Sequence, residues 1–228
     1  MALILKAAGV TFTNFITSVS PAENPGGWFD FGIDEASSLK DKTNNQDLTS
    51  FGITAAISYT ATSVVFPQAS AGENFFRYSN KDLRQFSVAA YVEDGSVFER
   101  VFTSVEGGGL STSNAGVLSF SVELEDGTAP SVSFLQASYP AAVVGTISED
   151  SGNSTVELTL TARYSDGSTN TASETFAGLV SLANETTTLD IGRNSSGEYV
   201  ASETLFYTRA LNASEINQTL NYLQVKYS

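Results

Sequence analysis

The side chains of this chain can perform little covalent chemistry, because its 228 residues include neither histidine nor cysteine. Without cysteine there is no thiol nucleophile, no disulfide and no cysteine-ligated zinc. Without histidine the sequence lacks the usual general base and the commonest transition-metal ligand, and a Ser-His-Asp arrangement cannot form. The groups that remain for catalysis or binding are carboxylates, amides, hydroxyls, basic side chains and aromatic rings.

Two glutamates are the candidates for a catalytic pair. Glu123 and Glu125 lie on a strand predicted over 117–125. Side chains two positions apart share a face, so this pair could approach the about 5–5.5 Å separation of a retaining glycosidase. Asp126-Gly127-Thr128 follows, which leaves an E-x-D-x-x-E pattern of acids incomplete and marks a turn. We therefore predict that the chain is not an enzyme, with a glycoside hydrolase as an alternative.

Carboxylate and amide side chains are concentrated between residues 30 and 47. Calcium takes several oxygen ligands from carboxylates, amides and carbonyls, and this segment offers them without the spacing of an EF-hand. We predict no required cofactor and one candidate ion, Ca²⁺, with an ordinary polar loop as the alternative. The candidate ligands are Asp30, Asp34, Asp41, Asn45 and Asp47, with Asn44 beside them.

Two residues are candidates for carbohydrate binding, which uses aromatic rings for stacking and polar side chains for hydroxyls. Tyr91 lies opposite the core-facing residues of a strand predicted over 86–92, and Arg163 does the same on a strand over 155–164. Both could line an exposed face of a sheet. The alternative is that each belongs to an ordinary protein surface.

The elements that must position these residues are mostly strands. Asp-Gly pairs at residues 94, 126 and 166 stand between apolar segments, as in β-hairpins. The segment 71–82 is predicted as a polar break, and Gly107-Gly108-Gly109 as a flexible loop rather than a phosphate loop. Strands are predicted over 53–66, 86–92, 97–102, 117–125, 131–136, 155–164, 168–176 and 205–207. Strands at this spacing predict an antiparallel sandwich.

One helix is predicted, over residues 213–223. Asn212 is a good N-cap residue, and Glu215 stands three positions later, as a capping box requires. Leu211 and Ile216 could form a hydrophobic staple. Ile216, Leu220 and Leu223 then form one apolar stripe.

Two segments, one over residues 28–48 and the other over 207–216, resemble laminin-G-like, concanavalin A-like jelly-roll domains. The last strand and helix match the closing corner "Y-x-R-A-L-(S/N)-x-x-E-I" of that family at Tyr207, Arg209, Ala210, Leu211, Asn212, Glu215 and Ile216. The opening segment matches at Trp28, Asp30, Asp34, Ser38, Leu39, Asp41, Asn45 and Leu48. The resemblance implies one all-β, concanavalin A-like (laminin-G-like) antiparallel β-sandwich jelly roll over 28–228, with a short C-terminal α-helix.

Residues 1–20 are predicted to be an apolar arm that docks on another subunit, or alternatively the first strand of the sandwich. They contain a single charge, Lys6, and a breaker-rich linker at 21–27 follows them. No signal peptide and no apolar run of about 20 residues is evident, so we expect neither export nor a membrane span. The arm residues with the bulkiest apolar side chains include Leu3, Leu5, Phe12 and Phe15.

The formal net charge of −14 argues against nucleic acid and anionic membranes as partners. The start of the chain, MALILKAAGVTFTNF, resembles the N-termini of phage-encoded laminin-G-like structural proteins. We therefore predict a non-enzymatic bacteriophage virion protein of the tail, baseplate, fibre or capsid decoration, made in the host cytoplasm. Its expected partners are other virion subunits, including copies of itself, and host-surface glycans. The alternative is a free-standing, lectin-like carbohydrate-binding module.

Overall fold

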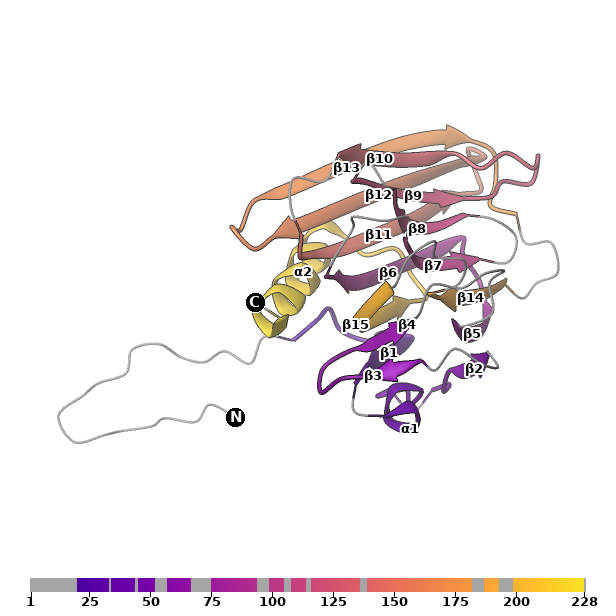
Figure 1. Ribbon diagram of the computed structural model, residues 1–228. Coiled ribbons are helices and arrows are strands. Elements are labelled where there is room, and N and C mark those ends of the chain that lie inside the picture. The colour runs from indigo at the N-terminus through magenta and orange to yellow at the C-terminus, as the bar shows by residue number, and fades with distance from the viewer. Residues whose placement is uncertain are drawn as a thin grey trace.

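The protein is an antiparallel β-sandwich in the computed structural model (Figure 1). The structure describes residues 20–32, 34–43, 45–51, 57–66, 75–93, 99–104, 108–113, 116–135, 139–181, 187–192 and 199–227. The predicted assembly residues Leu3, Leu5, Phe12 and Phe15 lie outside these ranges, as does Asn44. All structural statements below concern the described residues.

Two sheets form the sandwich. In the described part of the chain, one sheet has eight strands, ordered β13 (Thr169–Ala177), β12 (Thr155–Tyr164), β11 (Ala141–Asp150), β6 (Gln85–Val92), β15 (Tyr199–Tyr207), β4 (Val64–Phe66) and β3 (Ser58–Tyr59), with β1 (Gly27–Asp30) also paired to β15. The other has seven, ordered β10 (Ser131–Leu135), β9 (Val117–Val122), β8 (Gly108–Thr112), β7 (Glu99–Ser104), β14 (Thr187–Ile191), β5 (Phe75–Lys81) and β2 (Thr49–Phe51). A single-turn helix, α1 (Glu35–Ser38), follows β1.

The core between the sheets comes from the alternation that the sequence predicts. Val156, Leu158 and Leu160 of β12 are fully buried, and so are Phe86 and Val88 of β6. Aromatic rings fill the centre: the ring of Phe206 stacks on that of Tyr78 at 5.2 Å between centroids and also packs against those of Phe29 and Phe86. Each large buried apolar side chain contributes about 1.5–3 kcal/mol before ordering costs.

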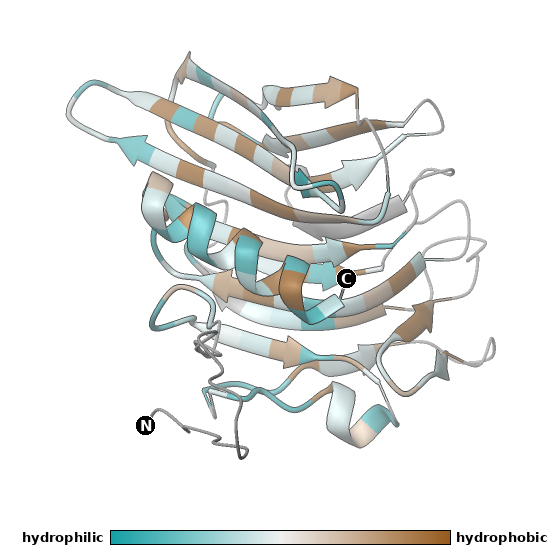
Figure 2. Ribbon diagram, turned by 90° about the vertical axis from the view of Figure 1, so that its left-hand side faces the viewer, coloured by the Kyte–Doolittle hydropathy of each residue, from teal (hydrophilic) through white to brown (hydrophobic). Residues whose placement is uncertain are grey.

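A second apolar layer lies on the outer face of the eight-stranded sheet. The helix α2 (Ala213–Tyr227) lies across that face, as Figure 2 shows. Its stripe of Ile216, Leu220 and Leu223 packs in one buried cluster with sheet residues that include Ala89 and Val144. Because one face of β6 points to the core and the other to α2, every residue from Phe86 to Val92 is buried.

The capping box predicted for this helix is confirmed. The side-chain oxygen of Asn212 accepts hydrogen bonds from the backbone N–H groups of Ser214 and Glu215, at 3.0 and 3.1 Å. The carboxylate of Glu215 accepts one in return from the Asn212 N–H, at 2.9 Å. Arg209 donates to the same carboxylate at 2.8 Å, which ties the corner before the helix to its first turn. The helix extends through Tyr227 rather than ending at residue 223.

The Asp-Gly hairpins predicted at residues 126 and 166 are confirmed. Gly127 and Gly167 have φ of 80° and 84°, and each turn joins paired neighbours, β9 with β10 and β12 with β13. The third hairpin, predicted from 86–92 to 97–102, is wrong. Both edges of β6 are already paired, with β11 and β15, so β7 joins the opposite sheet instead.

Two loop predictions are also wrong. The segment 71–82, expected to be a polar break, contains β5, whose residues Phe76 and Tyr78 are fully buried in the core. Gly108 and Gly109, expected in a flexible loop, begin β8. Gly108 has φ of 88°, and a Cβ there would meet the Ser121 carbonyl oxygen at 2.7 Å, so the close pairing with β9 requires glycine.

Candidate functional site

A cluster of charged and aromatic side chains lies where the last turn of α2 crosses β1 and β15. The antiparallel register of β1 with β15 places Asp30 directly opposite Glu203. Cross-strand partners point to the same face of a sheet, and here that face is the one covered by α2. The two carboxylates therefore meet the end of the helix, which supplies Lys226 and Tyr227.

Glu203 is a fully buried carboxylate with four donors around it. It accepts hydrogen bonds from the indole N–H of Trp28, the hydroxyl of Tyr222 at 2.8 Å and the hydroxyl of Tyr227 at 3.0 Å. The ammonium of Lys226 pairs with it at 2.9 Å. A buried charge is tolerated when it is paired and hydrogen-bonded in this way, and the interaction fastens the end of α2 to the sheet.

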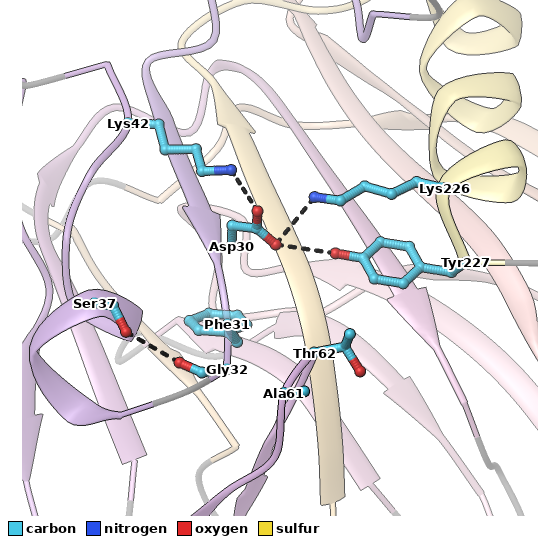
Figure 3. A pocket seen from close by; sticks show the side chains of 9 residues that line it. All are labelled: Asp30, Phe31, Gly32, Ser37, Lys42, Ala61, Thr62, Lys226 and Tyr227. Carbon is cyan, nitrogen blue, oxygen red and sulfur yellow. Dashed lines mark hydrogen bonds and ion pairs between the residues drawn. The ribbon is translucent and has the colours of Figure 1, made fainter.

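Asp30 is the second carboxylate of the cluster and is partly exposed. Figure 3 shows it between Lys42 and Lys226, with the Tyr227 hydroxyl alongside. The Lys226 nitrogen lies 3.0 Å from its carboxylate and the Tyr227 oxygen 3.1 Å. Burial would raise the pKa of Asp30, but the hydrogen bonds from Lys42 and Lys226 outweigh it and the pKa is lowered. The group is ionised at neutral pH.

Two adjoining cavities share Lys226 and Tyr227 of this cluster, together with Thr62, as wall residues. The first has a volume of about 360 Å³, and the second of about 460 Å³. Both volumes fall in the range of about 300–1,000 Å³ usual for small-molecule sites. The first is lined by Asp30, Phe31, Gly32, Ser37, Lys42, Ala61, Thr62, Lys226 and Tyr227 (Figure 3). The second is lined by Thr62, Tyr91, Glu93, Pro140, Lys226 and Tyr227.

The walls of these cavities offer hydrogen-bond donors and acceptors beside aromatic surface. Lys42 and Lys226 supply ammonium donors, Asp30 and Glu93 supply carboxylate acceptors, and Thr62 supplies a hydroxyl. Such a mixture suits a ligand with many hydroxyl groups. None of these residues forms a nucleophile with a general base.

The two residues predicted to bind carbohydrate share a row on the outer face of the sheet. Tyr91 on β6 and Arg163 on β12 both pair with Ala142 of the strand between them. The expectation of an exposed position is wrong for Tyr91, because α2 covers it, whereas Arg163 is half-buried. Tyr91 is 3% exposed, its ring stacks on that of Tyr227 at 4.9 Å, and its hydroxyl donates to the Tyr227 carbonyl. It still lines the second cavity.

Arg163 lies toward the other end of α2. Its guanidinium donates to the side-chain oxygen of Asn217 at 3.0 Å, so it holds the helix against β12. It lines neither cavity. A role of Tyr91 and Arg163 in carbohydrate binding stays a prediction.

The residues predicted to bind calcium do not converge. Among the described residues, no group of three or more Asp or Glu side chains is placed to hold a metal ion. Asp34 caps α1 by accepting from the Ser37 N–H at 2.8 Å. Asp47 accepts from the Asp41 N–H at 3.0 Å and pairs with Lys40. Asp30 is paired with the two lysines described above, so calcium binding remains a prediction.

Asp41 organises the loop in which these acids lie. It is fully buried and accepts hydrogen bonds from the backbone N–H groups of Trp28, Thr43, Asn45 and Gln46, and from the Thr43 hydroxyl. The Asn45 side chain donates to the Gly26 carbonyl at 2.9 Å. These contacts are those of the alternative, an ordered polar loop.

Glu93, Glu203, Lys226 and Tyr227 were not singled out by the sequence reasoning. One signal for Glu203 was available: Ser202-Glu203-Thr204 interrupts an otherwise apolar strand. A charged residue in such a strand is expected to have a buried partner. The catalytic candidates Glu123 and Glu125 both precede the turn at Asp126 and line neither cavity. Glu125 is exposed.

Comparison with known proteins supports the fold. No family model matches the sequence, and neither does any curated protein sequence. Among solved structures, the binding domain of botulinum neurotoxin DC in complex with SialylT matches at TM-score 0.60 and 12% identity, over 86% of this chain and 52% of that one. This chain thus spans about half of that structure. Peanut lectin with a 9mer peptide matches at TM-score 0.38 and 10% identity, over 78% of this chain and 95% of that one.

The first of these likenesses concerns the fold alone. The chain is an all-β, antiparallel β-sandwich with a C-terminal helix, the architecture that its two terminal motifs predict. In the described part of the chain, no helix is both long and apolar enough to cross a membrane.

Proposed function

We propose that this chain is a non-enzymatic, lectin-like carbohydrate-binding protein whose site is the pair of cavities on either side of Tyr227. One observation carries the proposal: two adjoining cavities present carboxylate, ammonium and hydroxyl groups beside aromatic side chains. Hydroxyl-rich ligands need donors and acceptors in this mixture. The lectin-like fold supports the same reading, although a fold does not determine a function.

A substitution that fills the cavities tests this site. Thr62 is exposed, lies between β3 and β4, and lines both cavities. Thr62→Trp should abolish binding on a glycan array without lowering the melting temperature. The matched control is Thr169→Trp, an exposed position on β13, which should bind as the unmodified protein does. If no glycan binds the unmodified protein, or if Thr62→Trp binds normally, the proposed site is wrong.

The proposed setting is a bacteriophage virion, in which the protein contacts host-surface glycans from the tail, baseplate, fibre or capsid surface. Its support is the low-charge segment 1–20 and the resemblance of MALILKAAGVTFTNF to phage structural proteins. Size-exclusion chromatography with light scattering, and electron micrographs of particles that carry the protein, test this setting. A strict monomer that binds a glycan would favour the free-standing lectin-like module.

A hydrolase is the candidate from a different class. Its support is limited to Glu123 and Glu125, which flank the turn at Asp126. Release of reducing sugar from polysaccharides, lost in Glu123→Gln, would establish that activity and overturn the non-enzymatic assignment.

A further inference from the structure

The charges around the two cavities bear on the kind of sugar they accept. Among the described lining residues, Lys42 and Lys226 provide the positive charge, and Asp30 and Glu93 provide the negative, so the two signs balance. Glu203 lines neither cavity but is buried behind them and pairs with Lys226. The chain as a whole has a formal charge of −14, so the wider field is negative.

Neither cation is available to neutralise an acidic ligand. The Lys226 ammonium is held between Glu203 at 2.9 Å and Asp30 at 3.0 Å. Lys42 is paired with Asp30 and lies 5.3 Å from the centre of the Trp28 ring. An anionic sugar would have to compete with carboxylates already in place, and like charges at close range oppose binding.

The groups that remain available suit neutral hydroxyls. An ammonium has three N–H donors, so Lys42 and Lys226 keep donors beyond the ion pairs described. The Thr62 hydroxyl has no hydrogen-bond partner within the described part of the chain and faces both cavities. Glu93 accepts from the Ser202 hydroxyl through one oxygen and presents its carboxylate to the second cavity.

The dimensions of the site leave room for two sugar units. Each cavity, of about 360 and 460 Å³, falls in the about 300–1,000 Å³ range of small-molecule sites and can hold at least one unit. The cavities share three wall residues, Thr62, Lys226 and Tyr227. Units placed in the two cavities would be neighbours on either side of this wall.

We infer that the site binds an uncharged oligosaccharide through at least two contiguous sugar units, one in each cavity, and that Glu93 selects against acidic sugars in the second. This inference rests on the proposed carbohydrate-binding function and specifies its ligand. Asp30, Lys42 and Thr62 hold the unit in the first cavity. Thr62, Glu93 and the exposed part of Lys226 hold its neighbour.

The first experiment measures selectivity with a glycan array that carries neutral oligosaccharides, their component monosaccharides, and sialylated, sulfated and uronic acid-bearing counterparts. Neutral chains should dominate. The tightest neutral disaccharide should then bind at least about tenfold more strongly than either of its monosaccharides in calorimetric titration, because a second cavity adds contacts without a second association cost.

The second experiment isolates Glu93. Glu93→Gln should narrow the preference for that disaccharide over its sialylated form by about threefold or more, because a like charge is removed. The matched control is Glu174→Gln, at an exposed position of β13, which should change neither affinity.

The outcomes distinguish a failure of carbohydrate binding from a failure of the neutral, two-unit site. If no probe on the array binds, the proposed function itself fails. If acidic glycans bind best, if a monosaccharide binds as tightly as the disaccharide, or if Glu93→Gln leaves selectivity unchanged, the protein remains carbohydrate-binding and the inference of a neutral, two-unit site is overturned.

Discussion

One buried carboxylate, Asp41, organises the loop in which the sequence predicts a calcium site. Its two oxygens accept hydrogen bonds from four backbone N–H groups and the Thr43 hydroxyl. Burial would raise the pKa of Asp41, but hydrogen bonds from the backbone of Gln46, Trp28 and Thr43 outweigh it and lower the pKa. The ionised carboxylate therefore fastens the backbone of this loop through its own hydrogen bonds.

Asp41→Asn should therefore destabilise the protein at neutral pH by about 2–3 kcal/mol, because hydrogen bonds to a charged group are lost and buried donors are left without an equal acceptor. Urea unfolding measures the difference. Since the folded-state pKa lies below the ordinary value of 3.8, the stabilisation is complete above that value. It is lost as the pH falls through the folded pKa, so the gap between the two proteins should close in acid.

The control for this prediction is Asp126→Asn, at an exposed turn whose carboxylate also accepts from a backbone N–H. It should have little effect at either pH. A variant Asp41→Asn as stable as the unmodified protein at neutral pH, or a gap that persists unchanged in acid, would contradict the assigned role.

At the residue scale, the sequence showed which side chains matter better than it showed what each of them contacts. Asp30 and Asp41 stood out within the opening motif, but their partners come from elsewhere. Lys226, the cation beside Asp30, lies almost two hundred residues away. The buried role of Glu203 was not predicted, because its partners Tyr222, Lys226 and Tyr227 all come from α2. The periodicity of a strand does not show which helix will cover it. Side-chain roles set by such distant contacts cannot be deduced from local spacing.

Elements were predictable where the signal was local. The Asp-Gly turns at 126 and 166 and the helix cap at Asn212 follow from a few adjacent residues. The hairpin expected between 86–92 and 97–102 does not form, because other strands of the sheet compete with β7 for the edges of β6. β11, which the sequence analysis did not identify as a strand, occupies one edge of β6, and β15 occupies the other. Local turn chemistry could not show that both edges were taken.

The cap of α2 is the element whose contribution can be measured most directly. Asn212→Ala should lower the free energy of unfolding by about 1 kcal/mol, the usual cost of losing an N-cap. Its pair with Glu215 is reciprocal, so the double variant Asn212→Ala/Glu215→Ala should cost less than the sum of the single variants. Thermal or urea unfolding of the four proteins measures this coupling.

Asn221→Ala provides the control on the same helix. Asn221 is exposed in the interior of α2, where alanine has the higher helix propensity. This variant should be as stable as the unmodified protein or slightly more so. Equal losses at positions 212 and 221 would show that the cap contributes nothing specific.

At the scale of the whole molecule, the architecture was predictable because its two ends carry specific motifs. The motif at Trp28 and the motif at Tyr207 lie far apart in the sequence, yet β1 and β15 pair directly. The segment 21–27 was expected to be a linker, and the structure shows it packed against α2 and β15. The Ala22 N–H donates to the Thr219 hydroxyl at 3.1 Å, and the Gly26 N–H to the Phe206 carbonyl at 2.7 Å.

These contacts show where a deletion must end to test the prediction that residues 1–20 serve assembly rather than the stability of the sandwich. Residues 1–19 are outside the described part of the structure, so the prediction rests on their sequence, which has one charge, Lys6. Deletion of residues 1–19 leaves Ala22 and Gly26 in place. The melting temperature should then change by less than about 4 °C, which for a domain of this size corresponds to about 1–2 kcal/mol.

Oligomers or particle incorporation should be lost in the same deletion, as measured by light scattering and by co-purification with particles. Deletion of residues 1–26 is the matched control, because it also removes the contacts of Ala22 with α2 and the Gly26 carbonyl that accepts from Tyr78. It should melt clearly lower. If the shorter deletion already melts far lower or fails to fold, residues 1–19 contribute a strand to the sandwich, and the assembly role is wrong. If the shorter deletion keeps both its stability and its oligomers, the segment serves neither purpose.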